Sequence, residues 1–208
     1  MRKLAMILAA TLLVAATASA GILDISATGT VLFNGISAAP LSGVNAGETA
    51  TVTFQVDSNN YVEDLPGDVR AYVIDPASFS LSFSGGVTVG LVNPLPTPAY
   101  FGLVDGFPVS DGFFVSSSTV SPGGVPLEQT PINFNLDLGY DGATLSSLDI
   151  EQAKGMYGFN GLTRFSMNLW QVFPDNAVME MDFVSLSIAN QPVSVDETSW
   201  SHVKAMYR

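Results

Sequence analysis

The stretch SFSLSFS, residues 78–84, decides the fold class. Phe79, Leu81 and Phe83 alternate with serines, and this period of two places the apolar side chains on one face of a β-strand and the hydroxyls on the other. The segments NFNLDL (133–138) and MEMDF (179–183) repeat the alternation with amides and carboxylates in place of serine. We therefore predict strands with one buried and one solvated face, the pattern typical of antiparallel sheets.

Similar segments recur along most of the chain, separated by the turn formers Gly, Pro, Asn and Asp. The predicted strands are 24–34, 49–57, 69–74, 78–84, 87–92, 100–104, 113–119, 132–138, 163–171 and 177–189. Few helical crossovers separate them, so we predict an all-β fold, a jelly-roll-like antiparallel β-sandwich. One short helix is predicted at 147–156, where Asp149 suits a first turn and Gly155 a C-cap; the alternative is a loop with one helical turn.

The first 20 residues have the order of a secretory signal peptide. Arg2 and Lys3 precede an apolar run at 4–16, and the small residues 18–20 form a cleavage site before Gly21. The apolar run is too short for a good membrane anchor, so we expect a secreted protein, extracellular or at the cell surface, with no transmembrane anchor after cleavage. About 188 of the 208 residues then remain, enough for one domain, which we place at 21–189.

Residues 190–208 differ in composition and are predicted to be a C-terminal tail. Trp200, Val203 and Tyr207 have the spacing of one helical face. So short a helix is marginal alone in water, and we expect it to pack against something. In one interpretation it packs on its own domain. In the other it is a sorting, recognition or docking element whose aromatic and basic residues make the contacts: Trp200, Lys204, Tyr207 and Arg208.

Composition excludes several classes of function. The net charge of −12 becomes −14 once Arg2 and Lys3 are removed, so the surface repels the phosphates of nucleic acids. The chain has no cysteine, which removes zinc–thiolate and cysteine-nucleophile chemistry. The one histidine, His202, lies close to the C-terminus, where it is poorly placed for a catalytic triad. We therefore predict that the protein is not an enzyme and requires no organic cofactor.

One polar segment, 57–68, is a candidate calcium site. Its oxygen-bearing side chains follow a predicted strand, and the candidate ligands are Asp57, Asn59, Glu63, Asp64 and Asp68. The EF-hand loop is excluded, because Tyr61 and Val62 occupy positions that need an oxygen ligand and a glycine. Two alternatives stay open: a calcium site of another kind, and a solvated hairpin loop, for which Asp, Asn and Gly are the usual residues.

Aromatic side chains are a second kind of candidate site. Five tyrosines lie near predicted loops, where they can anchor a partner: Tyr61, Tyr72, Tyr100, Tyr140 and Tyr157. Trp170 lies in the apolar strand FSMNLW with Met167 and Leu169, and we interpret it as a core residue. Glycoside hydrolysis needs two carboxylates at a defined separation across a cleft, and the sequence contains no signal for that separation.

Three motifs follow one another in the first half of the chain: an Ala-x-Gly-x-Val strand, a Gly-Glu-Thr strand that ends in Asp-Ser, and a Phe-Ser-Leu strand followed by Gly-Gly. Their positions are Ala27, Gly29, Val31, Gly47, Glu48, Thr49, Phe54, Asp57, Ser58, Phe79, Leu81, Gly85 and Gly86. A later leucine-rich segment adds Leu136, Leu138, Gly142 and Leu145. These motifs resemble those of bacterial exported proteins of the PEP-CTERM class.

The resemblance implies an exported, mostly β protein of the cell surface or extracellular matrix, with no catalytic residues to carry over. The chain lacks Pro-Glu-Pro, a C-terminal apolar span and a terminal arginine cluster, the features that give the class its name and its sorting. We predict an exported, non-catalytic structural or binding protein, with envelope or matrix polysaccharide or protein as partner. The first alternative is a carbohydrate- or calcium-binding module, for which we expect Trp170 or several tyrosines on one exposed face. The second is a two-carboxylate glycoside hydrolase.

Overall fold

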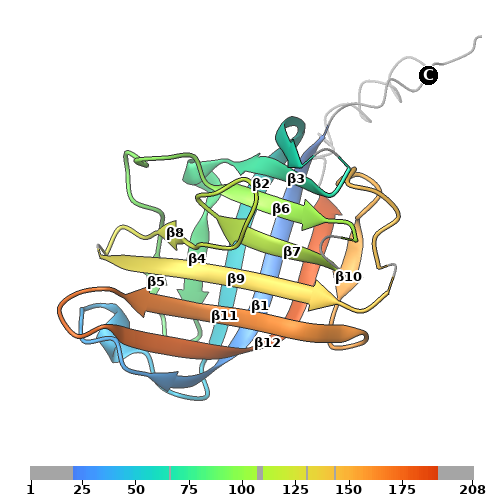
Figure 1. Cartoon of the computed structure of the whole chain (residues 1–208). Coiled ribbons are helices and arrows are strands. Elements are labelled where there is room, and N and C mark those ends of the chain that lie inside the picture. The colour runs from blue at the N-terminus through green and yellow to red at the C-terminus, as the bar shows by residue number, and fades with distance from the viewer. Residues whose placement is uncertain (1–20, 66, 107–109, 130, 143, 192–208) are drawn as a thin grey trace, which may run out of the picture.

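The fold is described from a computed structural model, which places residues 21–191 except 66, 107–109, 130 and 143 (Figure 1). The predicted signal peptide lies outside the described residues. So does the predicted tail beyond residue 191, including Trp200, Lys204, Tyr207 and Arg208. The prediction of an all-β, antiparallel fold is confirmed. No element in the described part of the chain is a helix long and apolar enough to span a membrane.

The described residues form strands and two short 3-10 helices, η1 (Leu41–Gly43) and η2 (Pro76–Ser78). The strands are β1 (Ile22–Asn34), β2 (Thr49–Leu65), β3 (Val69–Ile74), β4 (Ser80–Phe83), β5 (Thr88–Val89), β6 (Tyr100–Val104), β7 (Asp111–Ser116), β8 (Val125–Pro126), β9 (Ile132–Tyr140), β10 (Gly155–Tyr157), β11 (Leu162–Gln171) and β12 (Ala177–Asn190). All ten predicted strands are present, and β8 and β10 are additional.

The strands belong to one 12-stranded antiparallel sheet that closes on itself like a ring. Its order runs β1-β12-β11-β9-β7-β6-β3-β2, and β2 pairs back with β1 from Ile22↔Asp57 to Thr30↔Thr49. β4 and β5 continue outward from β2, while β10 and β8 pair with β12 and β9. Figure 1 shows β6, β7, β9 and β11 in front of β1, β2 and β4 and crossing them, so two faces of the same sheet enclose the core.

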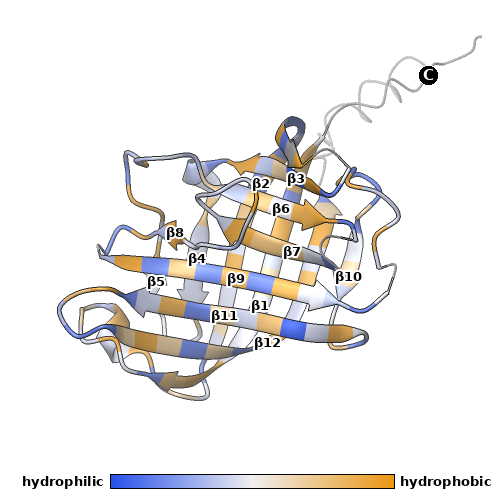
Figure 2. Ribbon diagram, viewed as in Figure 1, coloured by the Kyte–Doolittle hydropathy of each residue, from blue (hydrophilic) through white to orange (hydrophobic). Residues whose placement is uncertain are grey.

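Alternation along each strand fills this core. In β4 the predicted pattern is confirmed, since Leu81 and Phe83 are 0% and 4% exposed while the alternating Ser80 and Ser82 face outward. The same alternation appears as successive apolar and polar bands along β9 and β11 (Figure 2). Aromatic rings bridge the two layers, with Phe54 lying 5.5 Å from Phe101 between ring centroids. Burial of large apolar side chains on both layers is the main stabilising contribution, about 1.5–3 kcal/mol for each fully buried one.

The helix predicted at 147–156 is wrong, and a loop with one helical turn describes the segment. The N–H of Ala153 bonds to the carbonyl of Asp149 at 3.2 Å, and the chain then enters β10. The hydroxyl of Tyr72 donates to the carbonyl of Leu148 at 2.7 Å and accepts from the N–H of Ile150 at 3.0 Å. In a helix over 147–156 the carbonyl of Leu148 would accept the N–H of Gln152, and the buried bond from Tyr72 takes its place, so packing overrides local propensity.

The loop predicted at 57–68 is mostly strand, because β2 continues to Leu65 and the hairpin turn follows it. Between the pairs Val56↔Ile74 and Tyr61↔Tyr72, β2 advances five residues while β3 advances two. The extra residues form a bulge, which bends β2 from its pairing with β1 to its pairing with β3. The polar run therefore marks an irregular strand rather than a long loop.

Candidate functional site

The structure distributes the predicted calcium ligands along the β2–β3 hairpin: Asp57, Asn59, Glu63, Asp64 and Asp68. The carboxylate of Asp57 accepts the N–H of Asn59 at 2.9 Å, a local turn contact. The carboxylate of Glu63 forms an ion pair with the guanidinium of Arg70 on β3. Asp64 lies within β2 and Asp68 in the turn. Among the described residues no group of three or more acidic or histidine side chains is arranged to hold a metal ion, and calcium binding by this set stays a prediction.

A second group of acids lies where the β6–β7 turn meets the β2–β3 hairpin. Burial raises the pKa of the Asp105 carboxyl, and the negative charges of Asp111 and Asp68 raise it further. Asp111 is 3% exposed, and its carboxylate accepts the N–H of Gly106 at 2.9 Å and the N–H of Leu145 at 2.7 Å. Because backbone donors occupy both oxygens of Asp111, this carboxylate ties two loops to the sheet and is poorly placed to exchange protons with a substrate.

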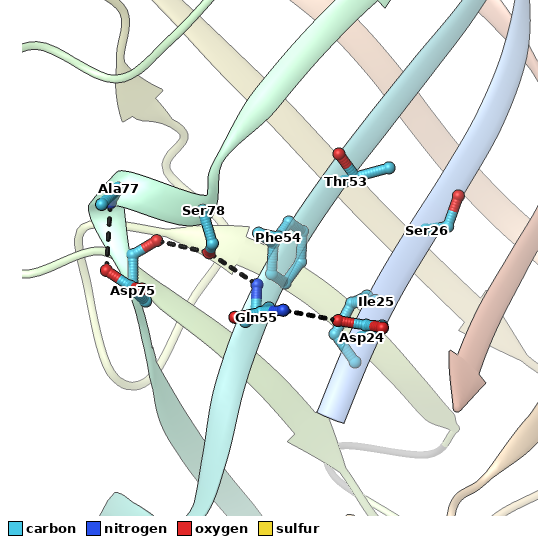
Figure 3. Close-up of a pocket in the computed structure, with 9 residues that line it drawn as sticks. All are labelled: Asp24, Ile25, Ser26, Thr53, Phe54, Gln55, Asp75, Ala77 and Ser78. Carbon is cyan, nitrogen blue, oxygen red and sulfur yellow. Dashed lines mark hydrogen bonds between the residues drawn. The ribbon is translucent and has the colours of Figure 1, made fainter. Parts of the chain in front are cut away.

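A hollow of about 580 Å³ lies on the outer face of β1 and β2, beside η2 (Figure 3). Its polar groups bond to one another. The side-chain amide of Gln55 donates to Asp24 at 2.9 Å, and the backbone N–H of Gln55 donates to the hydroxyl of Ser78 at 2.8 Å. The carboxylate of Asp75 accepts the N–H of Ala77 at 3.0 Å and caps η2. This hollow is therefore a seam where η2 joins the sheet, with its carboxylates used in local contacts.

Around this seam, the outer face of the layer formed by β1, β2, β4 and the end of β12 carries short hydroxyl side chains. We call it the hydroxyl face. Its members are Ser26, Thr28, Thr30, Thr49, Thr51, Thr53, Ser80, Ser82, Ser185 and Ser187. The register places them in rows across the strands, for example Ser82 opposite Thr51 and Thr51 opposite Thr28. Thr28 and Ser185 share a hydrogen bond of 2.8 Å.

The outer face of the layer formed by β9, β11 and the start of β12 carries several amides, a carboxylate and an indole, and we call it the Trp170 face. Its members come from β9, β11 and the start of β12: Asn133, Asn135, Ser166, Asn168, Trp170, Val178 and Glu180. Two rows cross the three strands. Trp170 is opposite Asn133 on one side and Val178 on the other, and Asn168 is likewise flanked by Asn135 and Glu180.

Trp170 is 47% exposed, so its interpretation as a core residue is wrong. Met167 and Leu169 are both 0% exposed, and the alternation of β11 turns the following residue outward. The indole Nε1–H donates to the side-chain oxygen of Asn176 at 2.8 Å, which fixes the ring while leaving much of it in contact with solvent. Tryptophan is among the most buried residue types on average, so a half-exposed indole held in place is an informative exception.

Some of the polar side chains around the indole are held in place by hydrogen bonds to one another. The side-chain amides of Asn135 and Asn168 both donate to the hydroxyl of Ser166, at 3.1 and 2.9 Å. Their amide oxygens and the carboxylate of Glu180 have no side-chain hydrogen bond to another described residue. A hollow of about 530 Å³ lies over this face, with residues 122–124 as its wall. It presents acceptor oxygens beside an aromatic surface.

The five tyrosines do not form one exposed face. Tyr72 and Tyr140 are 0% and 1% exposed. Tyr157 packs against the core, and Tyr100 is half-buried at the start of β6. Tyr61 is 42% exposed but lies under the guanidinium of Arg70, whose central carbon is 4.3 Å from the ring centroid. The Trp170 face is thus the candidate site. Trp170 on an exposed face is expected from the sequence only for the alternative of a binding module, and the other residues of the Trp170 face were not predicted. The alternation that buries Met167 and Leu169 is the signal that turns their neighbours on β11 outward.

An indole ring beside amide and carboxylate oxygens can bind a carbohydrate. The ring packs on the C–H side of a sugar, and the oxygens accept hydrogen bonds from its hydroxyls. This combination occurs on the Trp170 face and not on the hydroxyl face or in the seam beside η2. Comparisons of the chain with family models, with curated proteins and with solved structures found no match.

Proposed function

We propose that the protein is an exported, non-catalytic binding protein of the cell surface or extracellular matrix, and that its Trp170 face binds carbohydrate. One observation carries the proposal: Trp170 is half-exposed, anchored through its Nε1–H, and set among amide and carboxylate side chains. The N-terminal signal pattern and the resemblance to the PEP-CTERM class support export and a place at the cell surface.

The architecture supports binding at this face. We infer that the closed sheet acts as a jelly-roll-like β-sandwich, with the ring flattened into two layers. In such a scaffold, strands hold side chains more rigidly than loops, which lowers the entropy lost on binding. Trp170, Asn168 and Ser166 all extend from β11. At Asn168 and Trp170 this strand is paired with both β9 and β12, and at Ser166 it is paired with β9.

The charge of the protein limits the type of glycan. The net charge is −12, and Glu180 on the Trp170 face forms no salt bridge with a described cation. A polysaccharide rich in uronic acids would meet repulsion at this surface. Neutral polysaccharides and those with amino sugars meet none, so we assign the ligand to these classes.

The test is retention of the purified mature chain on a panel of polysaccharides: cellulose, chitin, chitosan, xylan, mannan, dextran and alginate. We expect retention on at least one neutral or amino-sugar member and none on alginate. Trp170→Ala should weaken that retention about tenfold or more, because a central aromatic contact commonly contributes more than 1.4 kcal/mol.

Phe165→Ala is the matched control, because Phe165 is also on β11 and is 41% exposed but does not line the hollow. It should bind like the wild type. Absence of retention on every member of the panel, or equal retention by Trp170→Ala and wild type, would contradict the proposal.

A further inference from the structure

A second hollow, of about 340 Å³, adjoins the one at Trp170. We call it the Arg164 hollow. Pro122 and Asp137 line both hollows, so the two are neighbours along the outer face of β9. From this continuity, and resting on the proposed carbohydrate binding, we propose that the two hollows form one groove that takes an extended glycan of several sugar units. The contacts of Trp170 and of Arg164 are then two subsites of the same site.

One wall of this groove is the loop that joins β7 to β8. It contributes Pro122 to both hollows, Gly123 to the first and Ser121 to the second. Its ends are tied together, because the N–H of Ser117 bonds to the carbonyl of Gly124 at 2.9 Å.

Gly124 shows how closely this loop approaches the sheet. It has a φ of 72°, and a Cβ there would lie 2.9 Å from the carbonyl oxygen of Phe134 on β9. Only glycine fits both the left-handed backbone and the close approach without strain. The wall is therefore held against β9 by the fold itself.

Arg164 is held by an ion pair with Asp137, one of the residues that line both hollows. Its guanidinium makes two contacts with the carboxylate of Asp137, at 2.9 Å from Nε and 3.1 Å from a terminal nitrogen. It also lies along the backbone of Gly139, where a Cβ would be 3.4 Å from the guanidinium carbon. The Arg164 side chain is 58% exposed, so the remaining N–H groups of its fork can donate to sugar hydroxyls.

The two subsites are too far apart for a single sugar ring. Asn133, opposite Trp170, and Asp137, held by Arg164, are four residues apart on β9, which is about 13 Å along a strand. The Arg164 hollow then reaches across β7 and β6 to Val69 on β3, three strand spacings or about 14 Å further. A ligand that contacts both subsites must therefore be a chain.

The experiment uses fragments, two to six sugar units long, of whichever polysaccharide the panel retains, with affinities measured by calorimetry on the mature chain. We expect affinity to rise about tenfold or more from the two-unit to the six-unit fragment. Arg164→Ala should weaken the six-unit fragment about tenfold and leave the two-unit fragment unchanged, and Trp170→Ala should weaken both. Arg164→Lys, which keeps the charge without the fork, should behave like Arg164→Ala.

Arg70→Ala is the matched control, because Arg70 also pairs with a carboxylate but does not line the groove. It should leave both affinities unchanged, and a melting curve for each variant separates folding from binding. Equal affinity for short and long fragments, or an Arg164→Ala loss that is the same at every length, would overturn the extended groove while leaving the carbohydrate proposal intact. Retention of no polysaccharide would remove both.

Discussion

The hydroxyl face and the Trp170 face are built on the same sheet and differ in almost everything that points outward. Both alternate with fully buried apolar residues, so their contribution to the core is alike. The hydroxyl face carries short Ser and Thr side chains, whereas the Trp170 face carries amides, a carboxylate and an indole under an overhanging loop. Inward positions therefore specify the core alike on both faces, and outward positions are where the two faces differ and where we propose that binding occurs.

β12 contributes to both faces. Glu180 near its start belongs to the Trp170 face, while Ser185 and Ser187 belong to the hydroxyl face. Between them the pairing of β12 with β1 shifts register at Val184, which is 47% exposed. A β-bulge of this kind bends a strand and turns it from one layer to the next. The two faces are thus separated by an irregularity in one strand.

Strands and long connections of the molecule are held in different ways. Ladder hydrogen bonds join the strands of the hydroxyl face. The segment 145–158 is held to the sheet also by side chains, the carboxylate of Asp111 and the hydroxyls of Tyr72 and Tyr140, and Tyr157 bonds within the segment to the carbonyl of Ala153. This difference predicts unequal effects of similar substitutions.

The largest effect on stability is expected at Asp111. Asp111→Ala removes the acceptor for two backbone N–H groups in a buried setting and should lower the free energy of unfolding by about 3 kcal/mol, measured by urea denaturation. Asp24→Ala removes one hydrogen bond, from the side-chain amide of Gln55, at a half-buried position on the outer side of β1. It should lower the free energy of unfolding by under about 1 kcal/mol. Equal costs at the two sites would show that the loops are not held by Asp111.

A smaller effect on the free energy of unfolding is expected at alkaline pH. Burial raises the pKa of Tyr140 to about 12 from 10.0, and burial also raises the pKa values of Tyr72 and Tyr157. In the unfolded chain these tyrosines ionise near 10, while in the folded protein they stay neutral, so the stability contribution is present below 10 and is lost as the pH rises towards 12.

The free energy of unfolding should therefore fall as the pH rises across this range. Urea denaturation at a series of fixed pH values measures it. Tyr140→Phe should flatten the fall, because it removes one of the shifted groups. An unchanged slope in that variant would rule out Tyr140 as a source of the pH dependence.

The smallest effect is expected at the hydroxyl face. Thr53 points outward from β2, and its hydroxyl makes no side-chain hydrogen bond with another described residue. Thr53→Lys should change the free energy of unfolding by less than about 0.5 kcal/mol and leave glycan retention unchanged. A loss of retention in this variant would move the binding surface to the opposite side of the sheet.

Much of the fold follows from the sequence, because alternation reports burial directly. The serines around Phe79 and Leu81 identify β4, and similar alternation identifies β9 and β12. The closure of the sheet does not follow, because it depends on which strands pair. Nothing in the local pattern shows that β2 turns at residues 57–60 and pairs with β1, β4 and β3 in turn. Asn59 and Asn60 resemble a turn, and only the partner strand makes them part of a bulge.

The candidate site was only partly predictable. The sequence is compatible with carbohydrate binding by an exposed Trp170 as an alternative, but the neighbouring Met167 and Leu169 make Trp170 resemble a core residue. Its outward direction follows from the alternation within β11, whereas its neighbours Asn133 and Glu180 come from strands whose register the sequence does not specify. The meeting of Arg164 with Asp137 depends on the same β9–β11 register.

Binding of carbohydrate to the Trp170 face can be mapped by NMR on the mature chain, labelled with nitrogen-15, as a fragment of a retained polysaccharide is added. We expect the backbone amides of β9, β11 and the start of β12 to shift, together with the indole Nε1–H of Trp170, while the amides of β1, β2 and β4 at the hydroxyl face stay in place. Shifts confined to the hydroxyl face, or an unperturbed Trp170 indole in a protein saturated with glycan, would contradict binding at the Trp170 face.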